Sequence, residues 1–110
     1  MIKFWREIIV PWGESDPFGL VYYPRIVAWF NDTEHELFRN IGYPIEQMIE
    51  NNKTTFVMGE IQFRFIGPAA YGDRIMTKIS LEKLGKRTLH WEYEAKNSNT
   101  EKPICEGKAT

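Results

Sequence analysis

The sequence predicts an α+β fold in which one long central helix packs against an antiparallel sheet of about five strands. Apolar residues recur about every 3.6 residues between Ile26 and Ile41, which indicates an amphipathic helix. Apolar and polar residues alternate before this segment and through most of the chain after it, as in half-buried strands. No second long helical segment separates the later strands, which argues against a ferredoxin-like order.

The order of elements follows from local signals. The first strand is predicted over residues 3–12, with Arg6 as the polar exception on its apolar face. Pro24 suits a first helical position, because the amide hydrogen that it lacks would be unpaired there, and Gly42 suits the end of the helix. The apolar stripe of this helix is expected to contain these residues: Ile26, Phe30, Thr33, Leu37 and Ile41.

The second half of the chain predicts a short helix and then strands. A short helix is expected over residues 44–52, followed by a loop. From residue 56 apolar and polar residues alternate with a period of two, which predicts four strands in an antiparallel meander. The turns of this meander are expected at residues 67–73, 85–87 and 97–100.

Length and composition limit the functional classes. With 110 residues, the chain is expected to form a single domain, 1–110, whose last strand is either short or continues beyond Thr110. The net charge of −1 argues against a nucleic-acid partner, and no apolar run is long enough for a membrane span. A single cysteine, Cys105, excludes a disulfide framework, and no histidine pair has ligand spacing, so no metal site is expected. We expect a cytoplasmic protein.

A loop rich in glycine and proline, from Trp12 to Pro24, holds the main candidate for catalysis. It places Asp16 shortly before the N-terminus of the helix, where free amides and the helix dipole favour negative charge. A carboxylate there can act on a carbonyl whose oxygen those amides stabilise. Because Pro24 has no amide hydrogen, Tyr23 is the expected donor. From the residue pattern alone, an aspartate that only orders a turn is the favoured interpretation, since Asp-Pro is a common start of a turn.

The same loop, with its Asp-Pro-x-Gly-x-Val-Tyr-Tyr-Pro run, resembles the active-site loop of the 4-hydroxybenzoyl-CoA thioesterase family. The resemblance covers nearly the whole chain and implies a hot-dog fold, which agrees with the predicted order of elements. The other matching segments are Trp29-Phe30 and Phe38-Arg39-x-x-Gly42 in the helix, and Phe63-x-x-x-x-Pro68-Ala69-x-Tyr71-Gly72-Asp73 after it.

The resemblance also implies roles for individual residues. Asp16 would be the nucleophile or general base, and the Tyr23 backbone amide would polarise the thioester carbonyl. The CoA thioester is the substrate, and no cofactor is implied. The substrate-binding positions carried over are Gly19, Tyr22, Asn31 and Met58. The CoA-binding positions carried over are Lys86, Arg87 and Thr88, which a solvated turn would explain equally well.

Two helix positions bear on the substrate and the branch of the family. Asn31 stands where the 4-hydroxybenzoyl enzymes have an aspartate that hydrogen-bonds the substrate phenol, so the 4-hydroxybenzoyl substrate itself is not implied. Another branch of the hot-dog enzymes uses a glutamate on this helix as its catalytic carboxylate, and Glu34 is a helix glutamate of this chain. Since Asp16 is present, Glu34 is expected at a dimer interface or on the helix surface.

The sequence therefore favours an acyl-CoA thioesterase that acts on an aryl- or short-chain acyl group. A homodimer or homotetramer is expected, with active sites at the subunit interface. Two alternatives stay open. One is a thioesterase for acyl-carrier-protein thioesters, and the other is a non-catalytic hot-dog protein that binds acyl-CoA.

Overall fold

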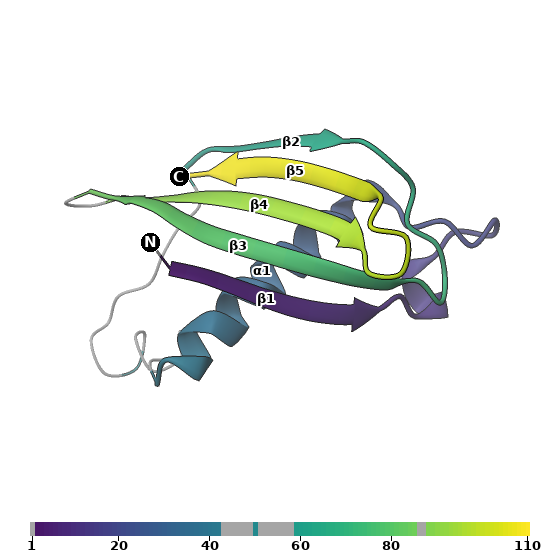
Figure 1. Cartoon of the computed structure of the whole chain (residues 1–110), viewed down its shortest axis with the longest axis horizontal. Coiled ribbons are helices and arrows are strands. Elements are labelled where there is room, and N and C mark those ends of the chain that lie inside the picture. The colour runs from purple at the N-terminus through teal and green to yellow at the C-terminus, as the bar shows by residue number, and fades with distance from the viewer. Residues whose placement is uncertain (1, 43–49, 51–58, 86–87) are drawn as a thin grey trace.

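A computed structural model describes residues 2–42, 50, 59–85 and 88–110. Five strands form one antiparallel sheet in the order β1-β3-β4-β5-β2, and the helix α1 crosses one face of it (Figure 1). The elements are β1 (Ile2–Ile9), the short 3-10 helix η1 (Trp12–Glu14), α1 (Tyr23–Asn40), β2 (Ile61–Phe65), β3 (Arg74–Leu84), β4 (Leu89–Asn97) and β5 (Pro103–Ala109).

This arrangement confirms the predicted fold class, but two details of the prediction are wrong. Strand β2 does not lie beside β3: it pairs with β5, with Phe63 opposite Gly107, so only β3, β4 and β5 form a meander. The edge of β3 that β2 was expected to occupy is taken by β1. The first strand also ends at Ile9 and not at Trp12, which lies in η1. The short helix expected over 44–52 lies mostly outside the described residues.

Helix α1 begins and ends close to the predicted positions. Gly42 has a φ of +86°, a left-handed conformation that confirms it as the C-terminal glycine. Ile41 is 57% exposed, so its predicted place in the apolar stripe is wrong: it follows the last helical residue and has already turned away from the sheet. Trp29 takes part in the buried face instead. The buried residues of α1 are Ile26, Trp29, Phe30, Thr33 and Leu37.

The sheet contributes alternate residues to the core. In β3 the buried side chains include Ile75, Thr77 and Ile79, and in β4 they are Trp91, Tyr93 and Ala95, as a period of two requires. These residues share one face of the sheet through the cross-strand register. Since α1 packs mainly over β3 and β1, the same face of β2 is less covered, and Phe65 is 44% exposed.

One glycine allows aromatic rings to meet across an intervening strand. Gly107 lies opposite both Tyr93 and Phe63 in the register of β4, β5 and β2. A Cβ at this position would come within 2.6 Å of a Phe63 ring atom and of the Gln62 carbonyl oxygen. With no side chain between them, the Tyr93 and Phe63 rings stack with their centroids 5.6 Å apart.

Polar contacts inside the helix–sheet interface fix how α1 lies on the sheet. The buried hydroxyls of Thr33 on α1 and Thr77 on β3 are 2.8 Å apart. Thr33 Oγ1 also lies 2.7 Å from the Trp29 carbonyl oxygen, and Thr77 Oγ1 lies 2.9 Å from the Arg6 carbonyl oxygen. Since each hydroxyl has one hydrogen, one of the two donates to its carbonyl and the other donates to the partner hydroxyl. Arg6 faces the helix and donates to the Trp29 carbonyl at 3.4 Å. Arg6, the polar residue on the apolar face predicted for the first strand, is thus half-buried beneath α1.

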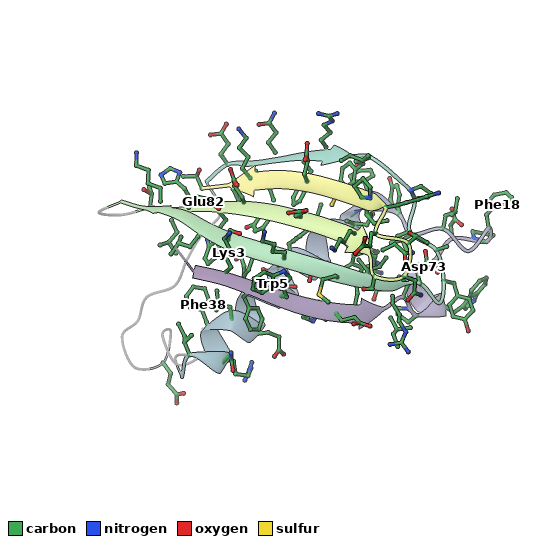
Figure 2. All side chains as sticks on the ribbon, in the orientation of Figure 1. Lys3, Trp5, Phe18, Phe38, Asp73 and Glu82 are labelled. Atoms are coloured by element: carbon green, nitrogen blue, oxygen red, sulfur yellow. The ribbon has the colours of Figure 1, made fainter. Side chains whose placement is uncertain are left out.

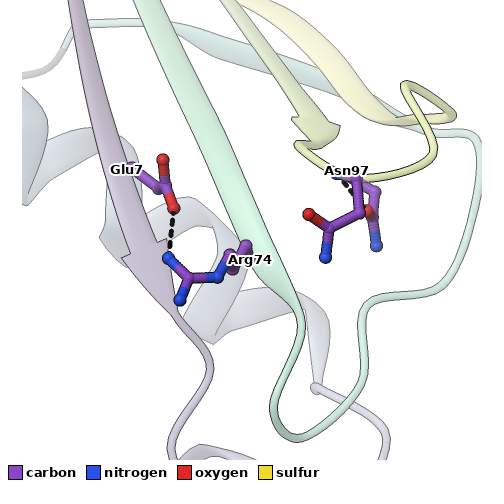
Figure 3. Close-up of polar contacts among 4 residues, drawn as sticks. Glu7, Arg74 and Asn97 are labelled. Atoms are coloured by element: carbon purple, nitrogen blue, oxygen red, sulfur yellow. Dashed lines mark hydrogen bonds and ion pairs between the residues drawn. The ribbon is translucent and has the colours of Figure 1, made fainter.

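The end of the sheet near the start of β3 has exposed polar contacts (Figure 3). Arg74 forms an ion pair with Glu7 at 3.1 Å, which joins β3 to β1. Asn97 accepts from the amides of Asn99 and Thr100 and so closes the turn between β4 and β5. Because exposed ion pairs contribute little, the hydrophobic interface with α1 remains the main stabilising contact.

Replacement of Thr33 by valine is expected to lower the free energy of unfolding by about 1–2 kcal/mol, because Thr77 loses a buried hydrogen-bond partner. The measurement is urea unfolding of Thr33→Val, Thr77→Val and the double variant. The double variant should lose less than the sum of the single losses, since the two hydroxyls interact directly. Additive losses would contradict this coupling.

Candidate active site

The loop that carries Asp16 is fixed by backbone bonds to the segment between β2 and β3. The Val21 amide donates to the Ala69 carbonyl at 2.9 Å, and the Tyr71 amide donates to the Gly19 carbonyl at 2.7 Å. The Gly72 amide donates to the Val10 carbonyl at 2.9 Å. Segments that are distant in the sequence therefore hold each other at one end of the sheet.

Within this loop, the two oxygens of the Asp16 carboxylate differ in their hydrogen bonds. Its Oδ1 accepts from the amides of Phe18 at 2.8 Å and Leu20 at 3.0 Å. The other oxygen has no hydrogen-bond partner among the described residues. The residue is half-buried, and no unpartnered Asp16 oxygen occurs among the enclosed polar atoms. Asp16 thus orders the turn through one oxygen and leaves the other reachable.

Gly19 gives the loop the backbone shape that this turn needs. Its φ is +79°, in the left-handed region that residues with a side chain rarely adopt. Its amide donates to the Asp16 carbonyl at 2.9 Å, and its own carbonyl accepts from Tyr71. The position predicted to bind substrate is therefore first of all a requirement of the turn.

The start of α1 offers a free amide at the same end of the molecule. Tyr22 is the N-cap residue and makes no side-chain capping bond. Its carbonyl accepts from the Arg25 amide at 3.0 Å, while Pro24 has no amide hydrogen. The Tyr23 amide has no acceptor among the described residues. The positive end of the helix dipole and a free donor therefore coincide at Tyr23.

A side-chain bond ties the loop to the helix. The indole Nε1 of Trp29 donates to Glu14 Oε2 at 2.7 Å. Trp29 is buried in the core, so the bond connects the loop to the buried face of α1. Sequence reasoning did not identify this pair, because nothing in the local pattern around Glu14 indicates a partner fifteen positions away.

Aromatic side chains surround this end of the molecule. Trp12 contacts Tyr71 edge-on with centroids 5.4 Å apart, and Tyr23 contacts both Tyr22 at 4.9 Å and Phe65 at 5.7 Å. Phe18 is 88% exposed and projects from the tip of the loop (Figure 2). An exposed cluster of this kind is typical of a binding or interaction surface.

The structure does not bring all of the predicted site residues together. Asp16, Gly19, Tyr22 and Tyr23 lie at one end of the sheet, and Asn31 lies further along α1 with an exposed side chain. Thr88 lies at the opposite end of a molecule 44 Å long, beside the β3–β4 turn (Figure 1). The predicted positions that lie outside the described residues are Met58, Lys86 and Arg87.

A second carboxylate, Glu34, is half-buried between α1 and the sheet. Tyr93 of β4 donates its hydroxyl to Glu34 Oε1. Burial raises the pKa of Glu34, while the bond from Tyr93 and the charge of His35 act in the opposite direction. Burial, followed by the charge and hydrogen bond of Glu34, raises the pKa of Tyr93. Glu34 is thus half-buried against the sheet and does not lie on the open surface of the helix, while its expected place at a dimer interface stays a prediction.

Another hollow among the described residues lies away from this loop. It measures about 470 Å³ and occupies the face of the sheet that α1 does not cover. Oppositely charged side chains line it and partly pair, as Arg64 does with Glu106 at 3.6 Å. Its lining residues all lie on strands, so it holds no helix N-terminus whose free amides could stabilise an oxyanion. We therefore place the candidate site at the Asp16 loop.

Neither a metal centre nor a membrane span is found in the part of the chain that the structure describes. No three His, Cys, Asp or Glu side chains there are grouped so that they could hold a metal ion. No helix there has the length and the apolar character to cross a membrane.

The geometry agrees with comparisons to known proteins. Residues 10–110 match the Thioesterase-like superfamily. The chain belongs to this family. The 1,4-dihydroxy-2-naphthoyl-CoA hydrolase of Thermosynechococcus vestitus is 23% identical over 88 residues, which are 80% of this chain and 60% of that protein. The chain thus spans less than two-thirds of the length of this relative.

Solved structures confirm the hot-dog fold. A 1,4-dihydroxy-2-naphthoyl-CoA thioesterase from Synechocystis has a TM-score of 0.91 at 15% identity, over 98% of this chain and 79% of that one. The 4-hydroxybenzoyl-CoA thioesterase from Pseudomonas sp. strain CBS-3 has a TM-score of 0.88 at 14% identity, over 99% of this chain and 82% of that one. The resemblance found in the sequence is therefore confirmed at the level of family and fold.

Replacement of Glu14 by alanine is expected to lower the free energy of unfolding by about 1–2 kcal/mol, because it leaves a buried indole N–H without an acceptor. Glu14→Gln retains an acceptor oxygen and should lose less than half as much. Urea unfolding of the three proteins measures the difference. Equal stability of the alanine and glutamine variants would contradict a structural role for this bond.

Proposed function

We propose that this chain is an acyl-CoA thioesterase that hydrolyses an aryl- or short-chain acyl-CoA thioester to the free acid and CoA. The observation that carries the proposal is the combination at one end of α1. There, Asp16 keeps one carboxylate oxygen unpaired, and the Tyr23 amide has no acceptor among the described residues. These are the two groups that acyl transfer to water requires.

The reaction would proceed by attack on the thioester carbonyl carbon. In one route, the free Asp16 oxygen forms the new bond, CoA leaves as the thiolate, and water then hydrolyses the resulting anhydride. In the other route, Asp16 takes a proton from water while the water oxygen attacks, and the proton passes to the leaving sulfur. In both routes the Tyr23 amide donates to the developing oxyanion, which is worth about 2.7–4 kcal/mol of the barrier.

The position of the β3–β4 turn favours a site shared between two subunits. Strand β3 has 11 residues and therefore separates its two ends by about 35 Å. Thr88, at the far end, and Asp16 of the same chain are thus too far apart to flank one thioester. If the turn binds CoA phosphates, a second copy of the chain must supply it.

Strand β2 is the edge at which a second copy would pair. Among the described residues, β5 is its only neighbour, so its outer backbone groups are free. Ile61, Phe65 and the adjoining Ile66 are each more than two-fifths exposed. A homodimer, or a homotetramer built from two such dimers, would cover this apolar edge.

Replacement of Asp16 by asparagine is expected to abolish hydrolysis of CoA thioesters, measured as release of free thiol. The loop should survive, because the asparagine Oδ1 can still accept from Phe18 and Leu20. Tyr23→Phe is the matched control: it keeps the backbone amide and should retain most activity. Wild-type turnover by Asp16→Asn in a protein of unchanged oligomeric state would contradict the assignment.

A mixing experiment tests the shared site. Asp16→Asn and the double variant Lys86→Ala/Arg87→Ala are each expected to hydrolyse acyl-CoA poorly. When they are unfolded together and refolded, roughly half of the dimers become heterodimers with one intact site of two, which restores about a quarter of the wild-type activity. The absence of any recovery, with heterodimers detected by mass spectrometry, would contradict a site built from two subunits.

A further inference from the structure

A continuous row of aromatic rings runs from the start of α1 into the interior. It begins at Tyr23, which contacts Phe65 at 5.7 Å, and continues to Phe63 at 6.0 Å. Phe63 stacks on Tyr93 at 5.6 Å, with the ring planes inclined by 11°. The hydroxyl of Tyr93 donates to Glu34. The row thus connects the free amide at Tyr23 with a half-buried carboxylate.

Glu34 lies on the same flank of α1 as Tyr23. The two residues are eleven positions apart, which is about three helical turns at about 3.6 residues per turn. Each contacts the sheet on the β2 side: Tyr23 through Phe65, and Glu34 through Tyr93. Three turns extend about 16 Å. Because helical side chains lean toward the N-terminus, the carboxylate lies on the order of 10 Å along the axis from Tyr23.

The Glu34 carboxylate is oriented but not fully used. Tyr93 holds Oε1, whereas Oε2 has no partner among the described residues. Oε2 is also absent from the enclosed unpartnered atoms, which in the described part of the chain comprise only the Ser98 hydroxyl. Oε2 is therefore accessible to a small hydrogen-bond donor. In the free protein water can donate to this oxygen, and a ligand hydroxyl can take the place of that water.

We propose that Glu34, oriented by Tyr93, determines specificity by accepting a hydrogen bond from a hydroxyl at the end of an aromatic acyl group remote from the thioester. This inference rests on the proposed function, because it places the thioester carbonyl at the Tyr23 amide. The ring of Phe65, which is 44% exposed, suits contact with an aromatic acyl group. A reach on the order of 10 Å suits two fused rings, with the hydroxyl on the ring farther from the carbonyl.

A purely structural role for Glu34 makes a different prediction. If the bond to Tyr93 only joined α1 to β4, loss of Glu34 would affect all substrates equally. A group that binds a substrate hydroxyl affects only substrates that carry one. The ratio of kcat/KM for a matched pair of thioesters therefore separates the two roles, while thermal unfolding reports the structural contribution.

The experiment compares 6-hydroxy-2-naphthoyl-CoA with 2-naphthoyl-CoA. Wild-type protein should prefer the hydroxylated thioester by about 10- to 100-fold in kcat/KM. Glu34→Met keeps the length and packing of the side chain without an acceptor, and should reduce the preference to less than about 3-fold. Glu34→Gln retains an acceptor oxygen and should keep most of the preference for the hydroxylated thioester. If Glu34→Met does not fold, the double variant Glu34→Met/Tyr93→Phe removes both polar partners and replaces it.

Three results would overturn the inference. They are the absence of a wild-type preference, an equal loss for both naphthoyl thioesters in Glu34→Met, and hydrolysis of propionyl-CoA with no hydrolysis of either naphthoyl thioester. In each of them the thioesterase function itself would stand. Failure to hydrolyse any acyl-CoA would instead overturn the proposed function, and this inference with it.

Discussion

The packing of one face of α1 against β3 and β1 is the contact on which the rest of the structure depends. It buries Trp29, Phe30 and Leu37, and the hydroxyl pair Thr33–Thr77 sets how far the helix lies along the sheet. A helix fixed in this way has its N-terminus at one end of the sheet only. Burial of the apolar face of the helix therefore also fixes the position of its N-terminus, where the free amide and the positive end of the dipole lie.

The Asp16 loop then depends on the helix that it precedes. Its chain must run from β1 to the start of α1, and the bond from Trp29 to Glu14 joins its middle to the buried helix. Backbone bonds to the segment before β3 hold its other side. A carboxylate on a loop held from both sides has little conformational freedom to lose, as the proposed catalytic role of Asp16 would require.

The same packing leaves the molecule asymmetric. Since α1 lies mainly over β3 and β1, it reaches the helix-facing side of β2 through aromatic rings such as Tyr23, which contacts Phe65. Gly107 lets the rings of β2 meet those of β4, because any larger residue would separate Tyr93 from Phe63. The uncovered rings and the free edge of β2 lie together, so the candidate acyl site and the candidate subunit interface are neighbours for one physical reason.

Local chemistry in the sequence determined the type and limits of α1, the alternation in the strands, the turn formed by Asp16 and Gly19, and the free Tyr23 amide beside Pro24. These follow from periodicity, from φ angles and from amide hydrogens, which involve neighbouring residues only. Only the tertiary structure decided that β2 pairs with β5, that Arg6 lies beneath α1, and that Glu34 meets Tyr93. Those contacts depend on which strands become neighbours, and the pattern along one strand does not specify its partner.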